Sequence, residues 1–351
     1  MISSFKHILL SCVLVCGAIQ HVYGQNFFQQ FFDKSKKETP SEQEITLEKD
    51  EDITGTLQAE GGVVDSPVPT AKPTQSNKNL SYIGSMQTYV SSYEDTLLDI
   101  ARDNNLGFVE IRSANPSVDP WLPGEDTEII IPTQHILPDA PRQGLVINLA
   151  EMRLYSFIDS ASPRTHPIGV GREGLKTPTG TTFIAGKKEG PKWRPTARMR
   201  RDNPDLPEVV EAGPDNPLGT HALYLGWREY LIHGTAKPWG IGRRVSSGCI
   251  RMYPEDIIKL YEATPHDTPV TVVDQPIKMA WINGVLYMEA HTSIQQSQDV
   301  ELEGEVSYDV PNGTLARLKE IAGDHVDKLD WDKVDQVLKE RRGYPEALLS
   351  L

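Results

Sequence analysis

The chain contains very little cysteine. Only three of its 351 residues are Cys, and two of them, Cys12 and Cys16, lie close to the N-terminus. If that segment is removed on export, Cys249 is left as a single thiol, which cannot form an internal disulfide. A lone thiol in a compartment where cysteines usually pair is either a small buried hydrophobic side chain or a nucleophile. The residues around Cys249 therefore have to be examined to tell whether it is a buried hydrophobic side chain or a nucleophile.

Positive charge is also scarce. The chain has 35 Lys and Arg against 49 Asp and Glu, which gives a formal net charge of −14. Because phosphate binding is driven by clustered Lys and Arg, this composition argues against nucleic acid as a partner. Hydrophobic residues make up 38% of the chain and aromatic residues 7%, which leaves room for unfolded segments between cores. A chain of this length is expected to hold two or three globular units with linkers.

The early hydrophobic run, Ile8–Ile19, is shorter than the roughly 20 apolar residues that a membrane-spanning helix needs. Lys6 precedes it, and Val22–Gly24 places compact residues at a cleavage site. This pattern predicts a cleavable signal peptide over residues 1–24. The sequence Leu9–Cys12 loosely resembles a lipobox but lies before the apolar run is complete, so lipid anchoring is not expected.

Residues 25–84 have the composition of a disordered linker. Asp33–Glu51 is rich in Lys, Glu, Ser and Thr, and Asp65–Lys78 is rich in Pro, Ser and Thr. Neither stretch has a sustained apolar period, so neither can bury enough surface to fold. We expect a solvated spacer.

Residues 85–134 are predicted to form a small α+β unit. Met86–Val90 reads as a strand, Asp95–Thr96 opens a helix, a second helix covers Phe108–Ala114, and Ile129–Ile131 reads as a closing strand. The second helix stops before Asn115-Pro116, because Pro disfavours helix in the residue before it. The unit resembles a LysM module, which implies binding to glycan strands that contain N-acetylglucosamine. The alternative is a generic α+β spacer domain.

Residues 141–275 are mostly short apolar or alternating runs separated by Gly and Pro turns, which predicts a mainly β fold with a sandwich or barrel-like core. One helix interrupts them at Pro254–Glu262. The predicted strands are Gly144–Asn148, Arg153–Phe157, Thr165–Val170, Thr181–Ile184, Ala222–Leu225, Tyr230–Ile232 and Pro269–Val273.

Residues 276–351 are predicted to form a hairpin followed by helices. Ile277–Ala290 alternates around Asn283-Gly284, a strong type I′ turn signal. Residues 310–351 are expected to be helical, with Asp330 as the N-cap of a helix that Gly343 and Pro345 end. This segment shows no catalytic pattern, so we expect it to serve in packing or partner contact.

The chemically informative segments are Tyr230–Thr235 and Val245–Met252. Cys249 follows His233 by 16 residues, and each lies at the end of an apolar strand. A thiol attacks as its thiolate, and a neighbouring imidazole can take its proton and later return it to a leaving amine. This pair therefore indicates a cysteine nucleophile with a histidine base.

The residues next to Cys249 suit acyl transfer. Gly248 lets a substrate approach the backbone closely, and the amides of Gly248 and Cys249 are candidate oxyanion donors, each typically worth about 3 kcal/mol in a transition state. Arg251 lies two residues beyond Cys249 and shares its strand face, so it is a candidate for gripping a substrate carboxylate. The alternative for Arg251 is a surface ion pair.

These motifs resemble the active-site signature of the L,D-transpeptidases, whose catalytic domain is often called YkuD. The signature has a His-Gly strand end, a loop, and then Ser-x-Gly-Cys-(Ile/Val)-Arg. Thr177–Gly180 resembles the Thr-Pro-x-Gly turn of the family, and Gly213–Gly219 resembles the stretch before the catalytic His in periplasmic members. One departure is Ser247, which stands where many members have a His.

The resemblance implies an exported, periplasmic enzyme that needs no metal or cofactor. Cys249 would attack a carbonyl of a peptidoglycan tetrapeptide stem, release D-alanine, and pass the acyl group on. The acceptor would be a diaminopimelate amine, a Lys of an outer-membrane lipoprotein, or water. His233 would be oriented by the Gly234 carbonyl. Candidates for lining the cleft are Thr235, Trp239, Ser246 and Ser247.

Two alternatives stay open. The chain could be a non-catalytic LysM-type peptidoglycan-binding protein, although the intact pair of His233 and Cys249 argues against this. It could also be a secreted L,D-carboxypeptidase or endopeptidase. A metallohydrolase is not expected, because no metal-ligand spacing is seen among the histidines His166, His221, His266 and His291.

Overall fold

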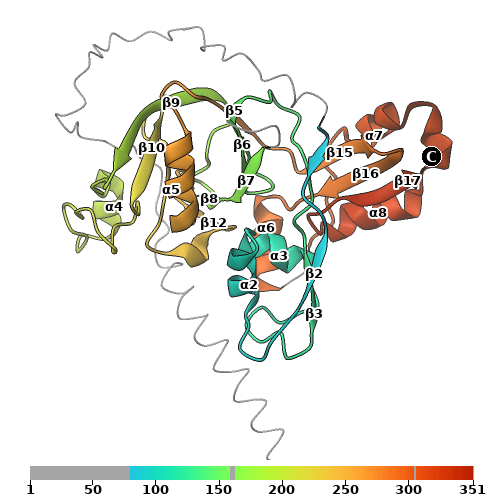
Figure 1. Cartoon of the computed structure of the whole chain (residues 1–351), viewed down its shortest axis with the longest axis horizontal. Helices are drawn as coiled ribbons and strands as arrows, with labels where there is room; N and C mark the ends of the chain where they lie inside the picture. Colours follow the sequence, from blue (N-terminus) through green and yellow to red (C-terminus); the bar gives the residue numbers. More distant parts are fainter. Residues whose placement is uncertain (1–79, 159–162, 304–305, 351) are drawn as a thin grey trace, which may run out of the picture. The chain divides into compact units, whose positions relative to one another are not determined.

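The computed structural model describes residues 80–158, 163–303 and 306–350, and the predicted signal peptide and most of the predicted linker lie outside them (Figure 1). Of these, residues 80–158, 163–195, 207–303 and 306–350 belong to one compact unit, and the short helix α4 (Ala197–Asp202) belongs to another. Among the described helices, none has both the length and the apolar character to span a bilayer.

An eight-stranded sheet forms the centre of the larger unit, which confirms the mainly β prediction. Its spatial order is β13-β11-β10-β9-β14-β5-β6-β7. The pairs β11–β13 and β14–β5 are parallel, and the other neighbours are antiparallel. The strands are β5 (Gly144–Asn148), β6 (Arg153–Phe157), β7 (Arg164–Pro167), β9 (Gly180–Glu189), β10 (His221–Leu225), β11 (Leu231–His233), β13 (Ile250–Arg251) and β14 (Pro269–Val273).

The strands β5 and β6 form a deeply buried part of the sheet. Every residue of β5 and β6 is buried, as expected for strands whose two faces are both covered. The predicted helix is α5 (Pro254–Ala263), which begins at a Pro and buries Ile257 and Leu260. It packs against β10 beside the sheet (Figure 1). Ile232 of β11, Ile250 of β13 and Ile257 of α5 belong to one hydrophobic core, so these elements are packed together.

One predicted strand, Thr165–Val170, is in fact two. β7 ends at Pro167, and β8 (Val170–Gly171) pairs with β12 (Arg244–Ser246) in a separate two-stranded sheet. Between them, Gly169 forms an isolated bridge with Arg251. The chain therefore leaves the edge of the main sheet at Pro167 and passes beside the segment that carries Cys249.

The N-terminal part of the described chain has the expected order of strand, helix, helix and strand. These elements are β2 (Gln87–Val90), α2 (Leu97–Asp103), α3 (Phe108–Ala114) and β3 (Glu128–Ile131). Thr96 caps α2 by accepting a hydrogen bond from the Asp99 amide. The predicted linker boundary at residue 84 is wrong, because β1 (Tyr82–Ile83) pairs with β4 (His135–Ile136).

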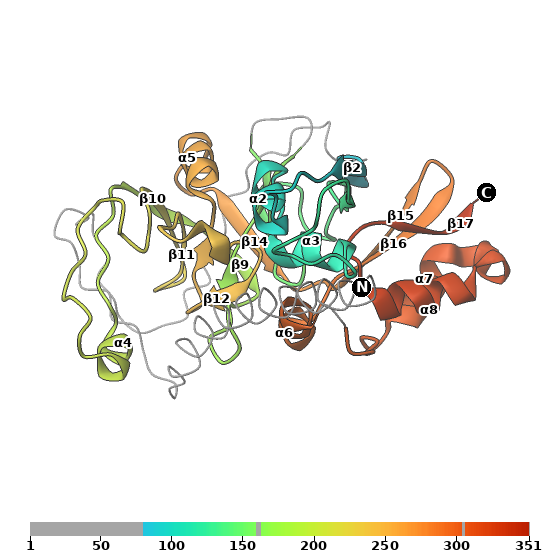
Figure 2. The same ribbon diagram turned by 90° about the horizontal axis from the view of Figure 1, so that it is seen from below.

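The C-terminal part contains the predicted hairpin. β15 (Ile277–Ile282) and β16 (Val285–Ala290) are joined by Asn283 and Gly284, whose φ angles of 50° and 79° fit a type I′ turn. Helices α7 and α8 pack along one face of this sheet (Figure 2). The remaining helices are α6 (Ile294–Leu302), α7 (Thr314–Ala322), the 3₁₀ helix η4 (Gly323–Lys328) and α8 (Trp331–Glu340).

The helix that Asp330 caps, α8, ends close to the predicted Gly343 and Pro345, at Arg341, which has a left-handed φ of 47°. The prediction that residues 310–351 are helical is wrong after this point, because a strand follows. The chain then forms β17 (Glu346–Ser350), which pairs with β16 and makes the hairpin a three-stranded sheet. The apolar residues Leu348 and Leu349 are buried in this sheet.

Candidate active site

Two neighbouring parallel strands carry the predicted catalytic residues. His233 is the last residue of β11, and Cys249 immediately precedes β13. The register pairs Ile232 with Ile250 and His233 with Arg251. Because side chains alternate along a strand, His233, Cys249 and Arg251 point to the same face. The register thus places His233 beside Arg251, with Cys249 two residues before Arg251, and the Arg251 charge acts on both the imidazole and the thiol.

His233 is positioned to act as an uncharged base. It is buried, and its Nδ1 lies 2.6 Å from the carbonyl oxygen of Gly234. A carbonyl can only accept, so Nδ1 carries the proton and Nε2 keeps its lone pair. Burial and then the Arg251 charge lower the pKa of His233 to about 3, against the opposing effect of the backbone contacts. At neutral pH the imidazole is therefore unprotonated.

The Cys249 thiol is also uncharged at rest. Its Sγ lies 3.6 Å from the Glu229 carbonyl oxygen, and the residue is partly exposed. Burial of the sulfur raises the pKa of Cys249, while the Leu231 amide and the Arg251 charge act in the opposite direction. The resting pair is thus a thiol and a neutral imidazole. Attack requires the imidazole to take the proton, as a general base does.

The turn before Cys249 is held by Ser246. The Ser246 hydroxyl donates to the Cys249 carbonyl oxygen at 2.5 Å and accepts from the Gly248 amide at 3.2 Å. Gly248 has a φ of +109°, and a Cβ there would lie 3.1 Å from Cε1 of Tyr230. Ser246, 1% exposed, therefore stabilises the turn, in place of the expected contact with substrate.

This bond also changes the expected oxyanion donor. The Gly248 amide is occupied by Ser246, so its predicted place in an oxyanion hole is not supported. The Cys249 amide donates no hydrogen bond within residues 80–158, 163–303 and 306–350. Since buried amides are nearly always paired, this free amide is the better donor for a developing oxyanion.

The other predicted cleft residues differ in their surroundings. Thr235 is buried and its hydroxyl accepts from the Lys237 amide at 2.9 Å, so it stabilises its own turn. Trp239 is 44% exposed on the 3₁₀ helix η3 (Pro238–Gly240). Ser247 is half-buried in the turn directly before Gly248 and Cys249. Trp239 and Ser247 remain candidates for substrate contact.

Arg251 provides positive charge next to the thiol. It makes no ion pair within the described part of the chain, and its buried Nε has no hydrogen-bond partner there. Burial lowers the pKa of Arg251. A thiolate at Cys249 would raise this pKa, and the Arg172 charge lowers it. The surface ion pair considered for Arg251 is therefore absent from these residues. A substrate carboxylate placed here would supply the missing anion. The sequence analysis did not single out Arg172, because an arginine in a loop gives no signal that it lies near Arg251.

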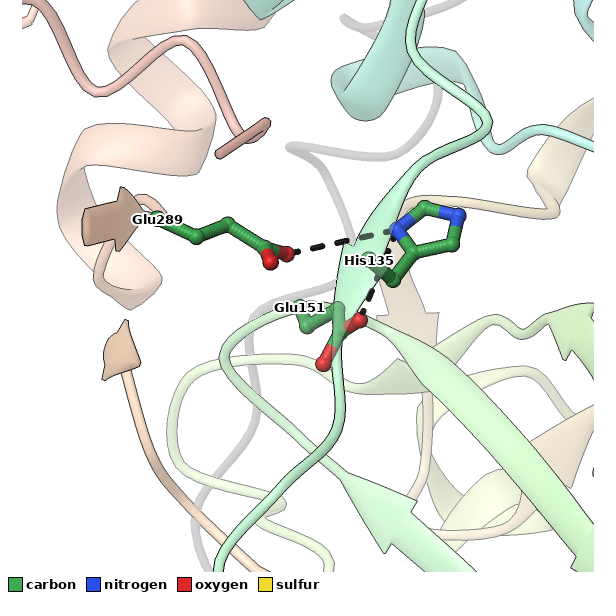
Figure 3. Close-up of side chains that lie close together, drawn as sticks. All are labelled: His135, Glu151 and Glu289. Carbon is green, nitrogen blue, oxygen red and sulfur yellow. Dashed lines mark ion pairs between the residues drawn. The ribbon is translucent and has the colours of Figure 1, made fainter. Parts of the chain in front are cut away.

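A second polar cluster lies away from this site. His135, Glu151 and Glu289 come from different elements and point toward one another (Figure 3). Their donor set could hold a metal ion, but the Lys278 ammonium lies 2.9 Å from Glu151 and 2.8 Å from Glu289. Lys278 thus supplies the cation between the two carboxylates. The cluster is a buried ion-pair network that joins β4, the β5–β6 turn and the C-terminal hairpin.

Comparison with known proteins agrees with this geometry. Residues 142–272, which include His233 and Cys249, match the model of the YkuD family, described as an L,D-transpeptidase catalytic domain. The Salmonella typhimurium protein named "Probable L,D-transpeptidase ErfK/SrfK" is 39% identical over 246 residues, covering 68% of this chain and 78% of that protein. The Escherichia coli protein named "Probable L,D-transpeptidase YbiS" is 41% identical over 257 residues, covering 71% and 81%.

Proposed function

This chain belongs to the L,D-transpeptidase family, and we propose that Cys249 and His233 carry out its acyl transfer. It is an enzyme that acts on the stem peptides of peptidoglycan. The observation that carries the assignment of roles is the bond between His233 Nδ1 and the Gly234 carbonyl. That bond fixes the tautomer whose Nε2 is free to accept the proton of a thiol on the same face of the sheet.

The first half-reaction makes a thioester. Nε2 of His233 takes the Cys249 proton as Sγ bonds to the carbonyl carbon of the third stem residue. The carbonyl oxygen becomes an oxyanion, which accepts from the Cys249 amide. When the intermediate collapses, His233 returns the proton to the departing amine, and D-alanine leaves with both electrons of the broken C–N bond. Arg251 holds a carboxylate of the stem in register.

The second half-reaction passes the acyl group to an acceptor. A neutral amine gives its proton to His233 as its nitrogen attacks the thioester, and the thiol is regenerated with that proton. An amine of diaminopimelate would give a cross-link between two stems, and a Lys of an outer-membrane lipoprotein would attach that protein to the wall. Water would give a trimmed stem. We propose an amine as the natural acceptor.

The test uses the purified mature chain and defined muropeptides, read by mass spectrometry. The wild type is expected to release D-alanine and form a dimer, and Cys249→Ala is expected to do neither while keeping its fold by circular dichroism. Cleavage of ordinary L-peptides would point instead to an endopeptidase. Activity retained by Cys249→Ala would refute the catalytic assignment.

We propose in addition that the enzyme works in the periplasm and that its N-terminal unit holds glycan strands. This unit exposes aromatic and apolar side chains, with Tyr93 78%, Leu122 65%, Trp121 38% and Tyr89 37% exposed. Aromatic faces suit the apolar faces of sugar rings. Replacing Tyr93 and Trp121 by Ala should weaken co-sedimentation with intact sacculi while turnover of a soluble muropeptide stays unchanged. Unchanged co-sedimentation would refute the role of this surface.

A further inference from the structure

Thr177 joins the loop after β8 to the turn that carries the nucleophile. The residue is 5% exposed, and its hydroxyl donates to the Gly248 carbonyl oxygen at 2.8 Å. The same hydroxyl oxygen accepts from the Gly171 amide at 3.3 Å. A hydroxyl has one proton to give, and here that proton goes to the peptide group immediately before Cys249.

The loop and the turn are packed too closely for this contact to be incidental. A Cβ placed on Gly171 would lie 2.2 Å from the Leu175 carbonyl oxygen, 2.9 Å from the Thr177 nitrogen and 3.2 Å from the Gly248 Cα. Only a residue without a side chain fits between these backbones. Gly171 therefore lets the Thr177 hydroxyl reach the Gly248 carbonyl.

Fixing this carbonyl also fixes an amide. The peptide unit between Gly248 and Cys249 is planar, and the described residues contain no cis peptide bond. In a trans unit the C=O and the N–H point in opposite directions. Because Thr177 holds the Gly248 oxygen, the Cys249 N–H must point away from Thr177. That N–H is the amide that finds no acceptor in the described parts of the chain.

We propose that Thr177 is a positioning residue for acyl transfer, which orients the Cys249 amide toward the oxyanion by holding the Gly248 carbonyl. Ser246 holds the flanking groups, the Gly248 amide and the Cys249 carbonyl. Together the two hydroxyls fix three of the four backbone polar groups of Gly248 and Cys249 and leave only the Cys249 N–H without a partner among the described residues. The proposal rests on the proposed function, since it assigns Thr177 to the acylation step on Cys249.

The experiment compares two reactions of the same thiol. Acylation by a carbapenem passes through a tetrahedral oxyanion, whereas alkylation by iodoacetamide displaces iodide at a saturated carbon and forms none. Thr177→Val keeps the shape of the side chain and removes the hydroxyl. It is expected to slow acylation about 10- to 100-fold, somewhat less than the loss of a whole oxyanion donor, because the amide is misdirected and still present. The alkylation rate should stay within about twofold of wild type.

Two control variants separate positioning from simple stability. Thr177→Ser keeps the hydroxyl and should restore acylation to within a few-fold of wild type. Thr179→Val makes the same chemical change two residues away, at an exposed position of the same turn, and should leave both rates unchanged. The muropeptide reaction of Thr177→Val should show a lower kcat with little change in KM.

Three outcomes overturn the proposal. Equal losses of acylation and alkylation in Thr177→Val would mean that the thiol itself is disturbed. No loss of acylation would mean that the amide needs no support from Thr177. No rescue by Thr177→Ser would mean that the hydroxyl is not the relevant group. Each of these leaves the proposed function intact, because that function fails only if Cys249→Ala keeps activity or if the wild type forms no acyl-enzyme.

Discussion

The low pKa of His233 predicts an unusual pH profile for the acylation of Cys249. With a pKa of about 3 instead of the ordinary 6.5, about 99% of the imidazole is unprotonated at pH 5, against about 3% for an ordinary histidine. The second-order rate constant for carbapenem acylation at pH 5 should therefore be within about twofold of its value at pH 7. An imidazole with the ordinary pKa would give a rate about 30-fold lower.

The assay is stopped-flow acylation of the wild-type enzyme between pH 4 and 8 at constant ionic strength, with His233→Gln as a control that keeps a polar side chain but has no base. The general-base mechanism predicts a flat profile over this range, because the thiol stays protonated and the imidazole stays neutral. A rate that rises through one apparent pKa near the ordinary histidine value would refute the buried neutral base. A tenfold rise per pH unit up to pH 8 would show instead that a pre-formed thiolate attacks.

Other perturbations have equally definite outcomes. Because the folded-state pKa of His233 is depressed, its contribution to stability is intact above pH 6.5 and is lost as the pH falls toward about 3; urea titrations should show about 3 kcal/mol lost by pH 4 from this group. Lys278→Met removes the cation from two buried carboxylates and should cost about 3–5 kcal/mol in the same assay. The matched change Lys333→Met, at a more exposed ion pair, should cost about 1 kcal/mol or less. Gly248→Ala adds a Cβ at a φ of +109° and 3.1 Å from Tyr230, so muropeptide turnover should fall by about 100-fold or more through the displaced Cys249 amide; near-normal turnover would contradict the geometry of the turn.

The sequence predicted the elements whose signals are local. The hairpin turn at Asn283-Gly284, the helix that begins at Pro254 and the cap at Asp330 each depend on a few adjacent residues, and each is present. β17 was missed because its five residues become a strand only by pairing with β16, about sixty positions earlier. Such pairing leaves no periodicity in so short a segment.

In the candidate site, too, local features could be predicted from the sequence and features that depend on distant segments could not. The residue types of His233 and Cys249 could be predicted because thiol catalysis needs a nearby imidazole, and the Gly234 carbonyl was expected as its partner, as found. The sequence could not predict which backbone amide is left to bind an oxyanion. The Gly248 amide donates to the Ser246 hydroxyl, and this bond depends on the geometry of the turn, which the residue types do not specify. Arg172 reaches the neighbourhood of Arg251 only because β8 pairs with β12.

The buried ion-pair network around Lys278 affects the choice of boundaries for a fragment of this enzyme. Glu151 belongs to the stretch that matches the catalytic-domain family, whereas His135 precedes that stretch and Lys278 and Glu289 follow it. A fragment trimmed to residues 142–272 would keep an interior carboxylate and discard its counter-ion. We therefore expect the fragment to be less stable than the longer chain, and a crystallisation or inhibitor-screening fragment should retain the flanking segments on both sides.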